Sequence, residues 1–281
     1  MSLPSTLAGR IAANASDAIQ RQLDLPFPTW VDRLRAAPNT LLRSALFGVV
    51  KPGRRRYVRE LPLPMAGEFA LTYTGERLDQ SDLDIFFQII HFARHRPASA
   101  VVSFPTRRLL RDIERGTGRT DYQWLHRRLV ALSSCGIVIA NRQAQRVYSG
   151  PILRGVQDGV SGQSAFTLNP ILRALFEPAE FTLIDWRDRL ALGSKQLAKW
   201  VHAFYATHAQ PHPIRVSTLK DLCGSEAKDL NDFRRDVKRA LEELRSRRLI
   251  RSWHIDARDL VHVVVLPTPS QVRHLNRKRT G

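Results

Sequence analysis

The spacing of apolar positions predicts one series of helices and strands in the first half of the chain. Helices are expected over residues 79–96, with Ser81 or Asp82 as the N-cap, and over 106–115 and 120–134. A short strand is expected at 101–104, and a turn at 116–118 separates the last two helices. Strands are predicted at 137–141, from 147 onward and at 164–168.

The second half repeats this order. Its predicted elements are a strand at 181–185, a helix over 187–207, a strand at 214–217, a helix from 218, a turn at Gly224, a helix over 230–247, and a hairpin of 250–255 with 260–266. Ser103 and Ile137 are 34 positions apart, and Ser217 and Ile250 are 33 apart. Helix, strand, helix, turn, helix and hairpin is the order of a winged-helix domain, so we expect two copies of that module.

The remaining segments complete an α+β chain of two tandem winged-helix (helix-turn-helix) domains with a flexible N-terminal arm. Pro26 and Pro28 exclude helix near the end of that arm, and residues 61–64 alternate Leu with Pro and must be extended. The predicted division is an arm at 1–30, a first domain with a preceding extension at 31–178, a second domain at 179–266 and a basic tail at 267–281.

Charge indicates the class of partner. Lys and Arg number 44 against 26 Asp and Glu, a net charge of +18 over 281 residues. Such an excess favours a polyanion, above all nucleic acid, although a merely solvated basic surface is the alternative. A membrane partner is disfavoured because no run of about 18 apolar residues and no signal-peptide core occur, so we expect a cytoplasmic protein.

The second helix of each helix-turn-helix is expected to read duplex DNA. The apolar stripe of 230–247 centres on Val237, and that of 120–134 centres on Leu129, which turns the opposite faces outward. The predicted DNA-binding residues are Arg119, Gln123, Arg127 and Arg128 in the first module and Asn231, Arg234, Arg235, Lys238 and Arg239 in the second. Arg suits guanine edges and phosphates, and Gln and Asn suit adenine, although ordinary solvated faces would have similar compositions.

Three further features are candidates for contact with DNA. Trp124 also turns outward, but an outward Trp is more often buried against a neighbouring element than held against DNA. The basic runs 54–56 and 273–279 are predicted to bind phosphate without reading sequence, or else to be solvent-facing charge.

No constellation for catalysis stands out. A phosphate-binding Gly-rich loop is missing, since Gly193-Ser194-Lys195 lacks the upstream glycine. The His91 and His95 pair lacks the Glu of a metalloprotease, and Cys135 and Cys223 have no partners at metal spacing. We therefore expect a protein that is not an enzyme and that needs no cofactor or metal, with structural thiols and histidines.

Two segments carry a family resemblance. Residues 38–47 (PNTLLRSALF) and 73–84 (YTGERLDQSDLD) resemble the TrfA-type initiators of broad-host-range plasmids, and the similarity extends over about 28–266. The resemblance implies binding to directly repeated origin sites (iterons), melting of an AT-rich segment, and recruitment of the host's DnaA, replicative helicase and sliding clamp. A transcriptional repressor and a nicking initiator are the alternatives, and a monomer–dimer equilibrium is left open.

The arm contains a clamp-binding pattern, Gln-x-x-Leu-x-Phe. Its residues are Gln22, Leu23, Leu25 and Phe27, with Pro26 interrupting the tighter form of the motif. An extended peptide of this kind places apolar side chains in pockets of a partner. The alternative is that Leu23, Leu25 and Phe27 staple the arm onto the first domain.

Overall fold

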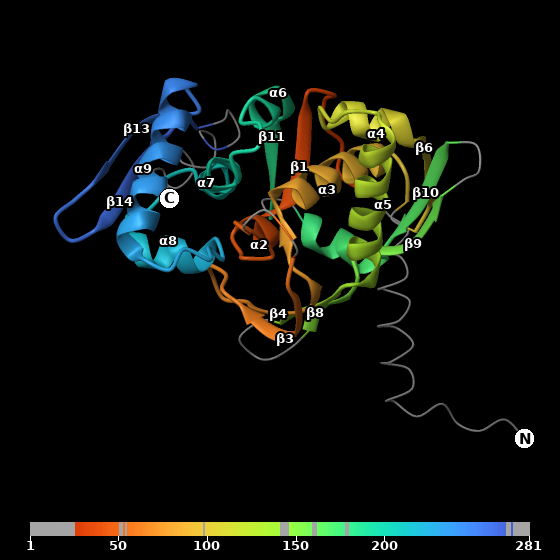
Figure 1. Ribbon diagram of the computed structural model, residues 1–281, viewed down its shortest axis with the longest axis horizontal. Coiled ribbons are helices and arrows are strands. Elements are labelled where there is room, and N and C mark those ends of the chain that lie inside the picture. Colours follow the sequence, from red (N-terminus) through yellow and green to blue (C-terminus); the bar gives the residue numbers. More distant parts are fainter. Residues whose placement is uncertain are drawn as a thin grey trace, which may run out of the picture.

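A computed structural model describes residues 26–50, 53, 55–97, 99–140, 146–158, 162–177, 180–267 and 271. Figure 1 shows two bodies side by side along the long axis, an N-terminal body around α3 and a C-terminal module around α7 and α9. The buried apolar side chains form two clusters, one reaching from Phe27 to Trp186 and Ala203, the other from Leu192 to Val263. Within the described residues, none of the helices is long and apolar enough to cross a membrane.

The N-terminal body is built around α3 (Gln80–Ala93), most of whose residues are buried. Asp79 caps this helix in place of the predicted Ser81 or Asp82, because its carboxylate accepts from both of their backbone N–H groups. Strands β3 (Tyr57–Leu63), β4 (Ala70–Glu76), β7 (Gly136–Ala140) and β8 (Arg146–Gly150) form one sheet in that order. Shorter elements are α2 (Asn39–Leu42), η1 (Pro170–Phe176) and the parallel pair β2 (Phe47–Gly48) and β5 (Leu78–Asp79).

The first predicted module is present as an array with one unexpected insertion. Its elements are β6 (Val101–Pro105), α4 (Thr106–Asp112), α5 (Arg119–Ser134), β9 (Leu153–Asp158) and β10 (Gln163–Leu168), with strand order β6-β10-β9. The prediction aligned the strand at Ile137 with the one at Ile250, and this was wrong, because β7 joins β4 and β8 in the four-stranded sheet. Spacing identified a strand there but not its partner.

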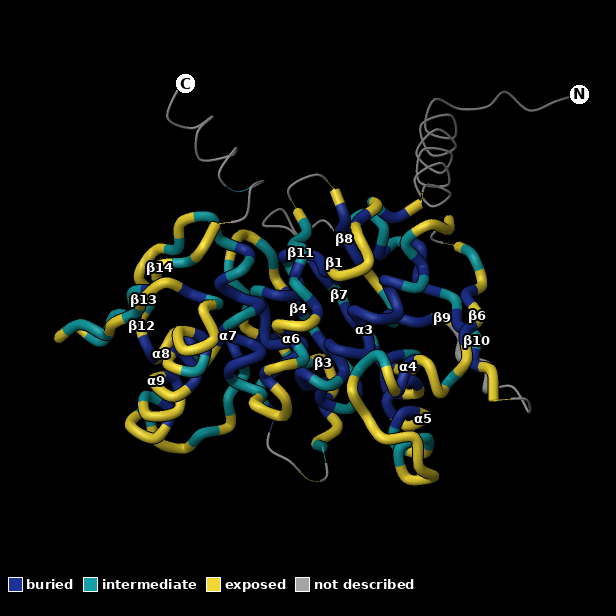
Figure 2. The backbone as a smooth tube through the Cα atoms, turned by 90° about the horizontal axis from the view of Figure 1, so that it is seen from above, coloured by how far each residue is buried: buried dark blue, intermediate teal, exposed yellow. Residues whose placement is uncertain are grey.

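The second module repeats the array without an insertion. It consists of β12 (Ile214–Arg215), α8 (Val216–Leu222), α9 (Leu230–Ser246), β13 (Ile250–Ile255) and β14 (Leu260–Val265), with strand order β12-β14-β13. In both arrays the strand before the two helices pairs with the last strand of the hairpin. Seen in Figure 2, α5 and α9 lie at opposite ends of the molecule and on the same side of it.

The two bodies divide later in the chain than residue 178. β11 (Phe181–Asp185) pairs with β1 (Leu34–Pro38), so it belongs to the N-terminal body. The helix predicted over 187–207 is two helices, α6 (Trp186–Leu190) and α7 (Gln196–Ala206), and Gly193 between them has a φ of +58°. Glycine adopts that conformation without steric cost, so it ends the first helix and lets the chain turn into the second module.

Candidate nucleic-acid interface

Helix α9 presents the outward face that the sequence predicts. Its apolar stripe, Phe233, Val237, Ala240, Leu241 and Leu244, is buried. Asn231, Arg235, Lys238 and Arg239 are all exposed on the helix. Arg235 pairs with Asp232 and Arg239 with Asp236, each pair within one turn and more than half exposed. Such exposed pairs contribute little to stability, so they leave both guanidinium groups available to a stronger anion.

Arg234 has a different position from its neighbours on α9. Its guanidinium is half-buried and donates to both carboxylate oxygens of Asp259, Nε to Oδ1 at 2.8 Å and Nη2 to Oδ2 at 2.9 Å. This ion pair also raises the pKa of Arg234. Asp259 lies in the turn between β13 and β14, so the fork ties the hairpin to the helix. In this structure Arg234 positions the hairpin and is not free to read bases.

Helix α5 offers a smaller exposed set than predicted. Arg119, Gln123 and Arg127 are exposed, but Arg128 is only 4% exposed. Arg128 donates Nη1 to Oε1 of Glu76 at 3.1 Å, and its Nε lies 3.2 Å from Oδ1 of Asp82. The prediction for Arg128 is therefore corrected, because the residue flanks the buried stripe of α5 and turns toward α3.

A groove of about 560 Å³ lies beside the exposed residues of α5. It is lined by Thr106, Tyr122, Gln123, Leu125, His126, Arg127, Leu129, Gly162 and Gln163. The hydroxyl group of Thr106, one of these residues, is 2.6 Å from that of Ser164, which joins the start of α4 to β10. The groove therefore runs between α5 and the hairpin, with two of the predicted DNA-binding residues in its wall.

Trp124 is held by the protein itself. It is half-buried against the first hydrophobic cluster, and the guanidinium carbon of Arg115 lies 3.7 Å from its ring centroid. This is close enough for a cation–π interaction. Trp124 is therefore packed against neighbouring elements of the protein, which is the alternative to a contact with DNA.

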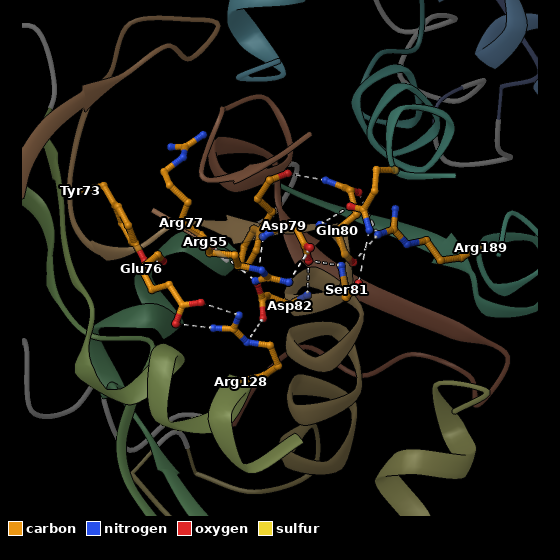
Figure 3. A network of polar contacts seen from close by, with 12 residues as sticks. Arg55, Tyr73, Glu76, Arg77, Asp79, Gln80, Ser81, Asp82, Arg128 and Arg189 are labelled. Carbon is orange, nitrogen blue, oxygen red and sulfur yellow. Dashed lines mark hydrogen bonds and ion pairs between the residues drawn. The ribbon is translucent and has the colours of Figure 1, made fainter. Parts of the chain in front are cut away.

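A buried polar network surrounds the first turn of α3 (Figure 3). Arg55 was predicted to bind phosphate, but its guanidinium is 11% exposed and pairs with Asp79 at 2.5 Å and with Asp82. Asp82 also forms an ion pair with Arg128 from α5. Burial raises the pKa of Asp82 to about 6, an effect that Asp79 increases and that the two arginines oppose. Arg55 is therefore a structural residue.

The clamp pattern lies mostly outside the described residues, since Gln22, Leu23 and Leu25 precede residue 26. Phe27 is 1% exposed, and its ring meets that of Phe176 edge to face at 5.1 Å. The Pro26 carbonyl accepts from Arg173 Nε at 3.0 Å. Phe27 therefore fixes the end of the arm to the first domain, as the alternative to clamp binding predicts. The tail at 273–279 also lies outside the described residues.

His91 and both cysteines have structural surroundings. Trp30 donates its indole N–H to Nδ1 of His91 at 3.2 Å, which requires that nitrogen to be unprotonated. Burial, followed by Arg35 and Arg94, lowers the pKa of His91 to about 3. Cys135 and Cys223 are buried free thiols, and burial raises their pKa values to about 11 and about 12. Thiols of such high pKa are poor nucleophiles at neutral pH.

Comparison with known proteins decides the family. The model of the family described as TrfA protein matches residues 15–264. The chain belongs to the TrfA family. The plasmid replication initiator protein TrfA of Escherichia coli is 24% identical over 241 aligned residues, and the match covers 83% of this chain and 62% of that protein. The chain thus spans less than two thirds of that relative's length.

The fold also has a counterpart among solved structures. Domains 2 and 3 of RctB superpose with a TM-score of 0.50 at 10% sequence identity, covering 74% of this chain and 86% of that one. At this identity the likeness concerns the fold alone.

The two segments that resemble the TrfA family do not lie on the exposed faces of α5 and α9. Residues 38–47 include α2 and the start of β2, and residues 73–84 run from β4 through β5 into α3. Both lie where the N-terminal body meets α7. Sequence reasoning did not predict that these segments contact α7. The available signal was the run of Asp79, Asp82 and Asp84 at the start of a helix whose residues are mostly buried.

Proposed function

We propose that this chain is a plasmid replication initiator that binds duplex DNA at directly repeated origin sites. The two arrays act as winged helices, with α5 and α9 each entering a major groove and the hairpins β9–β10 and β13–β14 acting as wings. Binding promotes melting of the origin and recruitment of host DnaA, replicative helicase and sliding clamp. The chain acts by binding and not as an enzyme.

The observation that carries the proposal is the repeated array, each copy of which exposes a basic helix face. Strand, two helices and a hairpin occur twice with matching strand order, and the second helix of each copy exposes arginines. Membership of the TrfA family supports the role in replication. The position of α5 and α9 on one side of the molecule supports simultaneous contact with one duplex (Figure 2).

The exposed residues suit different parts of the DNA. Arg235 and Arg239 have the planar fork that pairs with guanine N7 and O6, whereas Asn231 and Gln123 suit adenine. Lys238, Arg119 and Arg127 suit phosphate, where a point charge is sufficient. Arg234 contributes indirectly, because it fixes the wing turn through Asp259.

Footprinting on the cognate plasmid tests the proposal against a winged-helix transcriptional repressor, the second reading left open by the sequence. Direct repeats in the footprint, each protecting about 20 bp, support an initiator with both helices engaged. A single palindrome beside a promoter supports the repressor. The salt dependence checks how much of the surface is engaged, because log K falls by about 0.9 per neutralised phosphate and a total slope shallower than about −3 means one module alone.

A further inference from the structure

The first TrfA-like segment and the residues just beyond it contact the C-terminal module at three points. Arg43 donates to Thr207 at the end of α7, Nε to the hydroxyl and Nη2 to the carbonyl, both at 2.7 Å. Trp200 donates its indole N–H to the Ser44 carbonyl at 3.2 Å. Just beyond the segment, the Val49 N–H donates to the carbonyl of Cys223 at 2.8 Å. Cys223 caps the end of α8, so this bond reaches the turn between α8 and α9.

The second TrfA-like segment contacts α6 and α7 through buried hydrogen bonds and ion pairs. Asp84 accepts from Arg189 Nε at 2.8 Å and from Lys199 Nζ at 2.5 Å. Gln80 accepts from Arg189 Nη2 through its side-chain oxygen at 2.9 Å, and its backbone N–H donates to the side chain of Gln196 at 2.9 Å. Arg189 is fully buried and also donates to the Lys199 carbonyl at 2.8 Å.

The two bodies also approach closely through their backbones. A Cβ built on Gly48 would lie 3.1 Å from the Cys223 carbonyl oxygen, and one on Gly224 would lie 3.1 Å from the Cβ of Ala45. Gly224 has a φ of +59° and belongs to the turn between α8 and α9. A side chain at either glycine would be crowded against the other body, which would have to shift by a few tenths of an ångström.

These contacts connect α5 to α9 through a series of buried groups, and Figure 3 shows the first step, from Arg128 to Asp82. Arg128 holds α5 to Asp82 in the first turn of α3. Two residues further on, Asp84 holds α3 to α7 through Lys199. Helix α7 in turn shares the second hydrophobic cluster with α9. Such a series has little freedom to rotate, because buried ion pairs and packed side chains resist displacement.

We infer that the interface of the two TrfA-like segments with α6, α7 and the α8–α9 turn sets the spacing between the two DNA elements that the protein accepts. Arg43, Asp84 and Gln196 are positioning residues for this specificity, although they touch no DNA. The inference rests on the proposed function. A change of one base pair moves one element by about 3.4 Å and turns it by about 36° relative to the other, which a rigid pair of helices cannot follow.

The test compares spacing preference in the full chain. Selection from random duplexes first identifies the two elements bound by the wild-type chain, and binding is then measured on sites with one or two base pairs inserted or deleted between them. The variants are Arg43→Ala, Gln196→Ala and their combination, all at half-buried positions. Lys195→Ala is the matched control, because Lys195 adjoins α7 but pairs with Glu243 inside the C-terminal module at 2.7 Å.

We expect the wild-type chain and the Lys195→Ala control to lose about tenfold or more in affinity per altered base pair, within the range of a mismatched contact. The Arg43→Ala and Gln196→Ala combination should reduce this discrimination to about threefold or less, while the identity of the selected elements stays the same. The single variants give the same comparison if the combination does not fold, as judged by thermal melting.

Two results would overturn the inference. One is a wild-type chain that binds both elements yet accepts all spacings equally. The other is a folded variant whose affinity drops evenly at every spacing, which would make the residues merely structural. A wild-type chain that selects no DNA, or a single element, would instead count against the proposed function itself.

Discussion

The charge balance around Asp84 makes a sharp prediction about stability. Its carboxylate contacts Arg189 and Lys199, and the three side chains are 7%, 0% and 8% exposed. Asp84→Asn keeps the shape but leaves two buried cations without this counter-charge. Breaking a buried pair in this way costs about 3–5 kcal/mol. At about 2–4 °C per kcal/mol for a chain of this size, we expect the melting temperature to fall by about 6–20 °C.

Lys199→Met should behave differently although it removes a member of the same cluster. Asp84 keeps its bond to Arg189, and the methionine fills the space of the lysine stem. Burial lowers the pKa of Lys199, which means that holding its ammonium group charged is unfavourable there. Removing that charge offsets the loss of the ion pair, so we expect a change within about 1 kcal/mol.

Scanning calorimetry measures both variants against Asp236→Asn, which breaks an exposed pair with Arg239 and should change stability by less than about 1 kcal/mol. We expect the melting temperature of Asp84→Asn to lie far below that of Lys199→Met. Equal losses for the two would show that the cluster stabilises the protein by packing and not by charge. A loss below about 1 kcal/mol for Asp84→Asn would refute the electrostatic reasoning altogether.

Four other substitutions separate surface from structural roles. Arg235→Ala should cost about 1–3 kcal/mol of affinity and relax preference at one or two bases, whereas Arg234→Ala should weaken all sequences alike, as competitive selection would show. Phe27→Ala should lower stability by about 3–5 kcal/mol in denaturant unfolding, and an unchanged stability would restore it as a free clamp anchor. His91 has a pKa of about 3 in the folded protein, so as the pH falls through 6.5 the imidazole is protonated in the unfolded chain but not in the folded one. Between pH 7 and 5 the free energy of unfolding of the wild type should therefore fall by up to about 2 kcal/mol more than that of His91→Gln.

The elements with regular periodicity could be predicted from the sequence. The apolar stripe around Val237 fixed both the extent of α9 and its outward face, because a helix with one buried side leaves a single solution. The continuous helix over 187–207 was wrong because apolar spacing persists across Gly193, whose positive φ only the fold reveals. The strand at Ile137 was found, but its pairing with β4 depends on residues far away in the sequence.

The candidate site was predictable in outline but not residue by residue. Arg127 and Arg128 are adjacent, and 100° of rotation separates an exposed guanidinium from a buried one. The helical angle alone cannot predict whether a residue at such a flanking position is exposed. Its burial depends on whether a neighbouring element carries an acidic partner, as β4 carries Glu76 for Arg128. The prediction that Arg234 contacts DNA was wrong for the same reason, because its partner Asp259 lies 25 positions away in the sequence.

The distribution of charge separates the two kinds of interaction in this protein. The cluster at α3 is balanced, and its members are Glu76, Asp79, Asp82 and Asp84 against Arg55, Arg128, Arg189 and Lys199. The whole excess of +18 therefore belongs to the rest of the chain, including the exposed faces of α5 and α9. Salt screens exposed charges far more than buried pairs. Added salt should therefore release the DNA while leaving the geometry between the two modules, and hence the accepted spacing, unchanged.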